Sequence, residues 1–320
     1  MNDLERSFAP GGTLERAIPG YRHRPQQVEF ANAVLQAIKG HGVLIAEAGT
    51  GTGKTFAYLV PALLEGGRVI VSTGTKTLQD QLFHRDLPLV RKALGVSADV
   101  ALLKGRANYV CLHHLEAAVE LGSFAAREEA AHIHRIRSFS KATITGDKSE
   151  CADVPESSGA WSQATSTREN CLGSACKHYQ ECFVMKARKR ASEADVVVVN
   201  HHLFFADVVL RDEGAADLLP AANTVIFDEA HHLPDLARLF FGQSVSTAQA
   251  VEYFIENLGA ITAPILTGII ADAFNLQTAI LLICTIAWGL CFLFYLGAIF
   301  TIDKDTQHLR SQMAERAKSM

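Results

Sequence analysis

The feature that most constrains the fold is a glycine-rich loop between an apolar run and a helical pattern. The run GVLIAEA at residues 42–48 predicts a buried strand, and the helical pattern FAYLVPALLEGG begins at residue 56. Between them lies AGTGTGKT at residues 48–55. Strand, glycine loop, Lys-Thr and helix in this order are typical of a phosphate-binding loop. The sequence therefore predicts an α/β domain that binds a nucleoside triphosphate.

Each residue type in this loop serves one part of a triphosphate. Glycines let backbone amides turn toward the phosphates, and the helix N-terminus adds positive potential. We expect Lys54 to reach the β and γ phosphates and Thr55 to ligate Mg²⁺. Ala48 stands where the strict pattern has glycine, which is a small change. The predicted ATP-binding residues of the loop are Ala48, Gly49, Thr50, Gly51, Thr52, Gly53, Lys54 and Thr55.

A pair of carboxylates supplies the second half of such a site. Asp228 and Glu229 directly follow the apolar run at residues 225–227, within the sequence TVIFDEAHH. Parallel sheets place their chemistry where buried strands end. We therefore expect Asp228 to hold Mg²⁺ through water and Glu229 to polarise the attacking water.

Other apolar runs, at residues 68–74, 194–202 and 224–232, predict further strands of a parallel sheet. The region at about residues 104–190 differs from them because it is richer in His, Lys, Arg and Cys. We interpret it as an insertion into the α/β domain. Within it, residues 149–170 are polar and are expected to be weakly structured.

Four cysteines in the insertion indicate a metal site. Cys171, Cys176 and Cys182 have the spacing C-x4-C-x5-C, and Cys111 ends the sequence KGRANYVC. The N-terminal sequence has no apolar signal core, so we expect reduced or metal-bound cysteines and a cytoplasmic location. Four thiolates can hold zinc or an iron–sulfur cluster, and the spacing alone does not decide between them.

Five motifs, in this order, resemble those of the XPD/DinG-like superfamily 2 DNA helicases, specifically the bacterial damage-response branch. They are AGTGTGKT, STGTKTLQDQL, KGRANYVC, ADVVVVNHHLFF and DEAHH. The resemblance covers residues 1–252 and implies a RecA-like P-loop ATP-binding domain with an inserted iron–sulfur domain. It also implies an ATP-dependent DNA helicase that moves 5′ to 3′ in DNA repair. For the four cysteines it implies a 4Fe-4S cluster rather than zinc.

The resemblance also implies roles for single residues. Arg24 and Gln27 would contact the adenine, and His231 would couple hydrolysis to movement. Residues 73–81 and the basic stretch at residues 177–190 would follow single-stranded or tailed duplex DNA, with Tyr109 and Tyr179 as candidate base-stacking partners. A solvated helix face is the alternative for the basic stretch. The candidate DNA contacts are Thr73, Thr75, Gln79, Arg106, Lys186, Arg188, Lys189 and Arg190.

The helicase pattern stops near residue 252. A complete motor of this family has two RecA-like domains, and the second supplies arginines that stabilise the transferring phosphoryl group. No such domain follows in the present sequence. We therefore expect the chain to carry only part of the motor and not to unwind DNA by itself.

Residues 253–320 predict a two-helix transmembrane hairpin and a cytoplasmic tail. Residues 273–302 are 30 consecutive positions without Asp, Glu, Lys or Arg, and a membrane span needs about 20 apolar residues. The hairpin resembles the last two helices of a major-facilitator transporter, so we expect a chimera of two genes and membrane association through residues 254–302. The alternatives are a membrane-tethered nucleotide or nucleic-acid binding module without turnover and a transporter fragment.

Overall fold

The computed structural model describes residues 3–49, 51–122, 127–212, 214, 218–241, 285 and 289. All but the last two belong to one compact unit, Met1–Gly242. The transmembrane hairpin predicted at residues 253–320, with membrane association at 254–302, lies outside the described residues apart from those two positions. In the described part of the chain, no helix is both long and apolar enough to cross a membrane.

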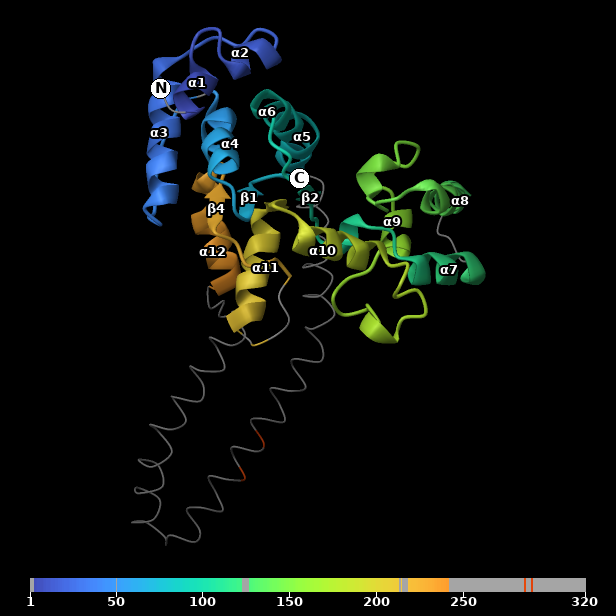
Figure 1. Cartoon of the computed structure of the whole chain (residues 1–320). Coiled ribbons are helices and arrows are strands. Elements are labelled where there is room, and N and C mark those ends of the chain that lie inside the picture. The colour runs from blue at the N-terminus through green and yellow to red at the C-terminus, as the bar shows by residue number, and fades with distance from the viewer. Residues whose placement is uncertain are drawn as a thin grey trace, which may run out of the picture. The chain divides into compact units, whose positions relative to one another are not determined.

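A four-stranded parallel sheet forms the centre of the unit (Figure 1). The strands are β1 (Val69–Thr73), β2 (Val100–Leu102), β3 (Val196–Asn200) and β4 (Thr224–Phe227), in the order β2-β3-β1-β4. Val69 of β1 lies opposite Val196 of β3 and Thr224 of β4. The prediction of an α/β fold with a parallel sheet is therefore confirmed.

Helices cover both faces of this sheet, because successive side chains of a strand point to opposite faces. Val69 and Val71 pack with one group of helices, and Ile70 packs with the insertion and with α11 (His201–Asp212). The first group comprises α1 (Asp3–Phe8), α2 (Thr13–Ala17), α3 (Pro25–Lys39), α4 (Lys54–Glu65) and α6 (Leu87–Leu94). α5 (Lys76–Gln81) and the π-helix η1 (Leu82–Asp86) connect β1 to α6.

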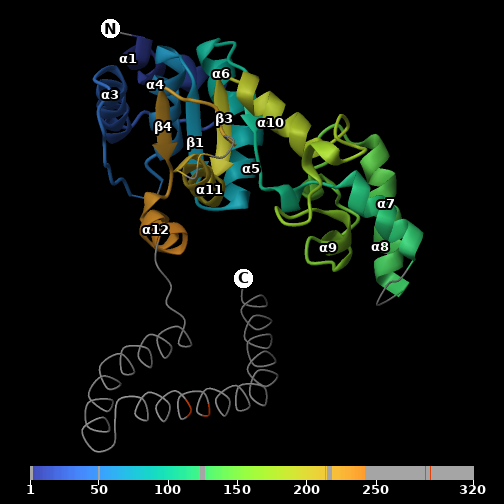
Figure 2. The same ribbon diagram turned by 90° about the horizontal axis from the view of Figure 1, so that it is seen from below.

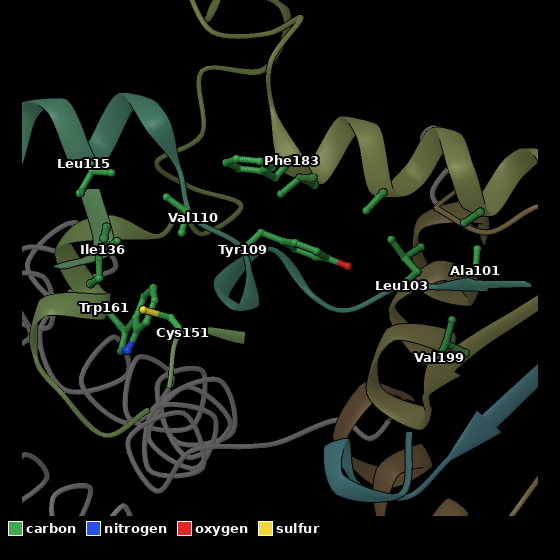
Figure 3. Packing of buried hydrophobic residues seen from close by; sticks show 14 of the residues in the cluster. Ala101, Leu103, Tyr109, Val110, Leu115, Ile136, Cys151, Trp161, Phe183 and Val199 are labelled. Atoms are coloured by element: carbon green, nitrogen blue, oxygen red, sulfur yellow. The ribbon is translucent and has the colours of Figure 1, made fainter. Parts of the chain in front are cut away.

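The insertion follows β2 and returns to the sheet through α10 (Figure 2). Its helices are α7 (Leu112–Leu121), α8 (Arg127–Ala142), α9 (Ala160–Ala164) and α10 (Phe183–Glu193), with short 3-10 turns at Arg106–Asn108, Lys148–Glu150 and Gly173–Ala175. One hydrophobic cluster runs from Val199 of β3 through Tyr109 and Phe183 to Trp161 (Figure 3). The insertion and the sheet therefore share a continuous core.

Residues 149–170 correct one sequence prediction. This stretch was expected to be weakly structured because its composition is polar, yet Val154 and Trp161 are buried and α9 forms within it. Cys151 is also buried in the same cluster. A few apolar side chains at suitable positions are enough to fix a polar segment against a core.

The strand predicted at residues 42–48 is a second correction. These residues form no strand, and the side chains of Val43 and Ile45 are 94% and 95% exposed. His41, with φ of 48°, turns the backbone just after α3. An apolar run favours burial, but a strand also needs a neighbouring strand that accepts its backbone hydrogen bonds, and no such pairing forms among the described residues. After β4, the 3-10 turn Ala230–His232 and α12 (Leu233–Phe241) complete the described part of this unit.

Candidate functional site

The phosphate loop leads directly into α4. Gly51 and Gly53 have φ of 78° and 79°, in the left-handed region that glycine adopts without a Cβ clash. Gly53 is the N-cap of α4, so Lys54 and Thr55 are the first two residues of the helix. Of the other predicted loop residues, the structure describes Ala48, Gly49 and Thr52, whereas Thr50 lies outside the described residues.

Two residues of the α3 region hold this loop. Gln27 is buried, and its Nε2 donates to the Gly53 carbonyl oxygen at 2.9 Å while its Oε1 accepts from the Tyr21 hydroxyl at 3.0 Å. Burial raises the pKa of Tyr21 to about 12, so this phenol remains a donor at neutral pH. Arg24 donates from Nη1 to the Gly51 carbonyl oxygen. Both predicted adenine contacts therefore brace the loop, and their contact with adenine stays a prediction.

The acidic residues after β4 face the loop. Nζ of Lys54 lies 3.5 Å from Oε1 of Glu229, and Nδ1 of His231 lies 3.3 Å from Oε2 of the same carboxylate. The Asp228 backbone N–H donates to the Ser72 carbonyl oxygen at 2.8 Å, which ties the turn to the carboxyl end of β1. The structure thus brings together the predicted catalytic residues Lys54, Asp228, Glu229 and His231.

Glu229 has an unusual backbone conformation. Its φ of 56° and ψ of 46° lie in the left-handed region, which a residue with a Cβ rarely adopts. Such outliers cost of order 1–3 kcal/mol each and persist where the surroundings hold them, often at active sites. Here the Glu229 carboxylate contacts Lys54 and His231, and the backbone N–H of the preceding Asp228 donates to the Ser72 carbonyl oxygen.

Thr55 and Asp228 are the predicted Mg²⁺ ligands, and both lie near the Tyr58 hydroxyl. Burial raises the pKa of Tyr58 well above its usual value, the Asp228 charge raises it further, and the Thr55 side chain has an opposing effect. Burial also raises the pKa of Asp228, with the Glu229 charge adding to it. Mg²⁺ prefers one or two carboxylate or hydroxyl oxygens together with phosphates and water. The residues present therefore fit this ion.

The four cysteines predicted to bind a metal lie in one region of the insertion. Burial raises the pKa of the Cys111 thiol, and Cys182 and Cys176 are close enough to raise it further. Arg106 donates from Nη1 to Sγ of Cys171 at 2.8 Å. Among the residues that the structure describes, no group of three or more His, Cys, Asp or Glu side chains is arranged to hold a metal ion. Four thiols suit zinc or iron–sulfur chemistry, so the cluster stays a proposal.

Some of the predicted DNA contacts are buried in this structure. Thr73 and Gln79 are fully buried, and Gln79 Nε2 donates to the carbonyl oxygens of Leu103 at 2.9 Å and Val198 at 3.2 Å. Gln79 thus satisfies carbonyl groups just after β2 and within β3, and the Thr73 hydroxyl donates to the Thr75 carbonyl oxygen at 3.2 Å, so neither side chain reaches the surface. Tyr109 is buried as well, so it cannot stack on a base. The sequence does not distinguish a polar side chain that satisfies backbone carbonyls from one that meets a ligand.

The remaining DNA candidates differ in exposure. Thr75 is exposed and caps α5, where its Oγ1 accepts from the Leu78 backbone N–H at 3.2 Å. Arg106 is half-buried against Cys171, and burial lowers the pKa of the half-buried Arg188. The exposed cations of α10 are Lys186, Lys189 and Arg190.

Two residues near the acidic turn were not predicted. His201 is fully buried after β3, with Nδ1 2.7 Å from the Ser72 hydroxyl. A Cβ added to Gly74 would lie 2.9 Å from Cδ2 of His232 and 3.8 Å from Cβ of Glu229, so a larger residue here would require the exposed His232 ring to move. The polar pair that ends the run ADVVVVNHH was the available signal for His201.

Comparisons with known proteins find similarity to helicases. Residues 24–116 match the family model described as DEAD/DEAH box helicase. The chain is 54% identical over 245 residues to the ATP-dependent DNA helicase YoaA of Escherichia coli, covering 77% of this chain and 38% of that protein. It is 37% identical over 243 residues to the ATP-dependent helicase DinG of Mycobacterium tuberculosis, covering 68% of this chain and 35% of that protein.

A solved XPD helicase structure aligns with a TM-score of 0.37 and 16% sequence identity, covering 68% of this chain and 34% of that one. The chain spans little more than a third of the length of the curated relatives it matches. The family model and the relatives YoaA and DinG support the resemblance to DinG-like helicases, and the comparisons give no support to the resemblance to a transporter.

Proposed function

We propose that this chain supplies the ATP-binding and iron–sulfur part of an ATP-dependent DNA helicase that acts 5′ to 3′ in DNA repair. The observation that carries the proposal is the approach of Lys54 to Glu229 at 3.5 Å, because it joins the phosphate loop to the acidic turn at one edge of the sheet. The names of the relatives, both helicases that depend on ATP, support the same function.

The proposed chemistry assigns one role to each residue of this edge. Lys54 binds the β and γ phosphates, and Thr55 and Asp228 hold Mg²⁺. Glu229 orients the attacking water, because its carboxylate lies beside Lys54 and its backbone conformation fixes its direction. His231 contacts the same carboxylate and therefore is placed to sense whether the water and phosphate are engaged.

The cysteines Cys111, Cys171, Cys176 and Cys182 would hold a 4Fe-4S cluster, which would supply a rigid cross-link to the insertion. One of the four sulfurs has a cationic neighbour. Arg106 donates to the Cys171 sulfur, and a cationic donor stabilises a negative sulfur. The resemblance to XPD/DinG-like helicases is the reason to prefer the cluster over zinc.

Single-stranded or tailed duplex DNA is the proposed polymer partner. Lys186, Lys189 and Arg190 form an exposed basic face on α10, and Thr75 is exposed at the start of α5. Such cations would follow the phosphate backbone without reading sequence. Unwinding by the whole protein is a proposal that needs a second motor domain, and membrane attachment through residues 254–302 is not part of it.

Nucleotide binding provides the direct test. Lys54→Ala should abolish binding of a fluorescent ATP analogue with Mg²⁺, because it removes the side-chain cation that faces the acidic turn. Lys39→Ala is a matched control, since Lys39 forms only a surface ion pair with Glu65 at 3.1 Å. Equal affinity in the parent and Lys54→Ala would remove the loop from the proposed function.

A further inference from the structure

We propose that Lys104 is a positioning residue that fastens α5 of the sheet domain to the cysteine-bearing insertion. The inference deepens the proposed function, on which its DNA-binding consequence rests. It starts from the burial of this lysine, whose side chain is only 2% exposed although lysine is rarely buried without partners.

The ammonium group of Lys104 joins two separate parts of the fold. Nζ lies 2.7 Å from Oδ1 of Asp80 on α5 and 2.7 Å from Oδ2 of Asp147 in the insertion. It also donates to the Ser149 hydroxyl at 3.2 Å. Burial acts to lower the pKa of Lys104, but the hydrogen bonds and charges of the two carboxylates outweigh it and raise the pKa, so the amine stays charged.

Each end of this junction is fixed to its own part of the chain. On the α5 side, Gln79 next to Asp80 donates to the carbonyl oxygens of Leu103 and Val198. On the other side, Asp147 accepts from the Ser149 backbone N–H at 3.0 Å and from its hydroxyl at 2.9 Å. A displacement of either part would therefore strain the ion pairs.

The loop that carries Asp147 packs against the residue that follows Cys182. Gly146, next to Asp147, packs so closely on Phe183 that an added Cβ would lie 2.2 Å from its Cγ. Phe183 is the first residue of α10, directly after Cys182. A contiguous route thus runs from Cys182 through Phe183 and the Asp147 loop to Lys104 and α5. Contiguity alone does not show coupling, so the inference needs a measured interaction.

The local charge environment contains two more cations. Burial lowers the pKa of Lys76, the first residue of α5, and the charges of Lys148 and Lys104 act in the same direction. Lys148 lies 3.7 Å from Glu156. These neighbours mean that the loss of the Lys104 charge would leave Asp80 and Asp147 only partly compensated. An uncompensated buried charge is strongly unfavourable.

The test uses the whole 320-residue chain with two test variants, the double variant that combines them, and one control. Lys104→Met removes the charge and keeps most of the side-chain volume, whereas Asp80→Asn loosens only the α5 end and keeps the Lys104–Asp147 pair. Asp80→Asn is the safer variant if Lys104→Met folds poorly. Lys39→Met is the control, because it removes the exposed Lys39–Glu65 ion pair of the sheet domain.

Hydrogen exchange in the absence of DNA is the first readout. Both test variants should raise the exchange rate of the α5 amides by about tenfold, while the amides of α4 stay unchanged. The double variant should exchange at α5 no faster than Lys104→Met alone, because the two residues act through one contact. Unchanged α5 exchange, additive effects, or equal acceleration in α4 and α5 would overturn the inference.

Equilibrium binding is the second readout. Single-stranded DNA affinity should fall about 5- to 150-fold in Lys104→Met, and affinity for the ATP analogue should not change. An equal loss of both affinities indicates general loosening and counts against a positioning role. If the parent chain binds no DNA, the proposed function fails at that point, whereas hydrogen exchange still decides whether Lys104 fastens α5.

Discussion

Replacing Gly53 with alanine should damage the phosphate loop in a way that can be separated into two causes. The first is the backbone, because φ of 79° costs an alanine about 1–2 kcal/mol. The second is a collision, since the added Cβ would lie 2.1 Å from Nε2 of Gln27. Nε2 is the far end of a flexible side chain. However, Gln27 is only 2% exposed, and both Nε2 and Oε1 are hydrogen-bonded, so the amide has no room to withdraw.

Displacing the buried Gln27 amide would break its hydrogen bonds to the half-buried Tyr21 and Gly53 and leave its own polar groups unsatisfied, which costs about 1–3 kcal/mol. The total for Gly53→Ala is therefore roughly 2–5 kcal/mol in the free energy of unfolding. Gly51→Ala is the matched control, because Gly51 has φ of 78° in the same loop and nothing lies within 4 Å of its added Cβ. It should cost only the backbone part, about 1–2 kcal/mol.

Urea unfolding followed by circular dichroism measures these differences. In a Gln27→Ala background the Cβ at position 53 has space, so Gly53→Ala should then cost no more than Gly51→Ala. The double-mutant cycle should give a coupling of about 1–3 kcal/mol between positions 27 and 53. Additive costs, or equal costs for Gly51→Ala and Gly53→Ala in the parent, would refute the contact as the reason for glycine at position 53.

Two further predictions concern the metal and the DNA. The anaerobically purified chain should be brown and carry about four irons. Cys171→Ser should bleach it, whereas Cys151→Ser, at a buried cysteine outside the predicted ligand set, should not. A colourless protein with one zinc would contradict the iron–sulfur assignment but leave the four predicted ligands in place. The affinity for single-stranded DNA should fall steeply with salt. Lys189→Ala should reduce the magnitude of the slope of log affinity against log salt by about 0.7, whereas Lys39→Ala should leave the slope unchanged. An unchanged slope in Lys189→Ala would show that Lys189 of α10 does not contact DNA.

The sequence predicted the sheet well where pattern and pairing agree. β1, β3 and β4 formed inside the predicted runs; continuous β-branched stretches suit β1 and β3, which are covered on both faces, whereas β4 lies at the edge of the sheet and is only partly buried. It failed at residues 42–48, where apolar composition was present but no paired strand was available. The three-residue strand β2 was not predicted, because Val100–Leu102 is too short to show a period.

The residues of the candidate site were also predicted only in part. The order of motifs was enough to expect Lys54, Asp228 and Glu229 together, because parallel strands bring their carboxyl ends to one edge. Sequence reasoning could not foresee that Gln79 satisfies carbonyl groups beneath α5, or that Lys104 is buried between two carboxylates. Those roles depend on contacts between distant segments, which residue type and local spacing do not encode.

Strand displacement on a 5′-tailed duplex with ATP tests the central claim most directly. The 320-residue chain should bind ATP and DNA but separate no strands, because stabilisation of the transferring phosphoryl group by a second motor domain is worth about 10³ to 10⁵ in rate. The same chain extended from residue 252 with the remaining domains of a helicase relative should separate them, and Glu229→Gln should stop it. Unwinding by residues 1–320 alone that Glu229→Gln abolishes would contradict the proposal that these residues supply the ATP-binding and iron–sulfur part of a helicase and need a second motor domain.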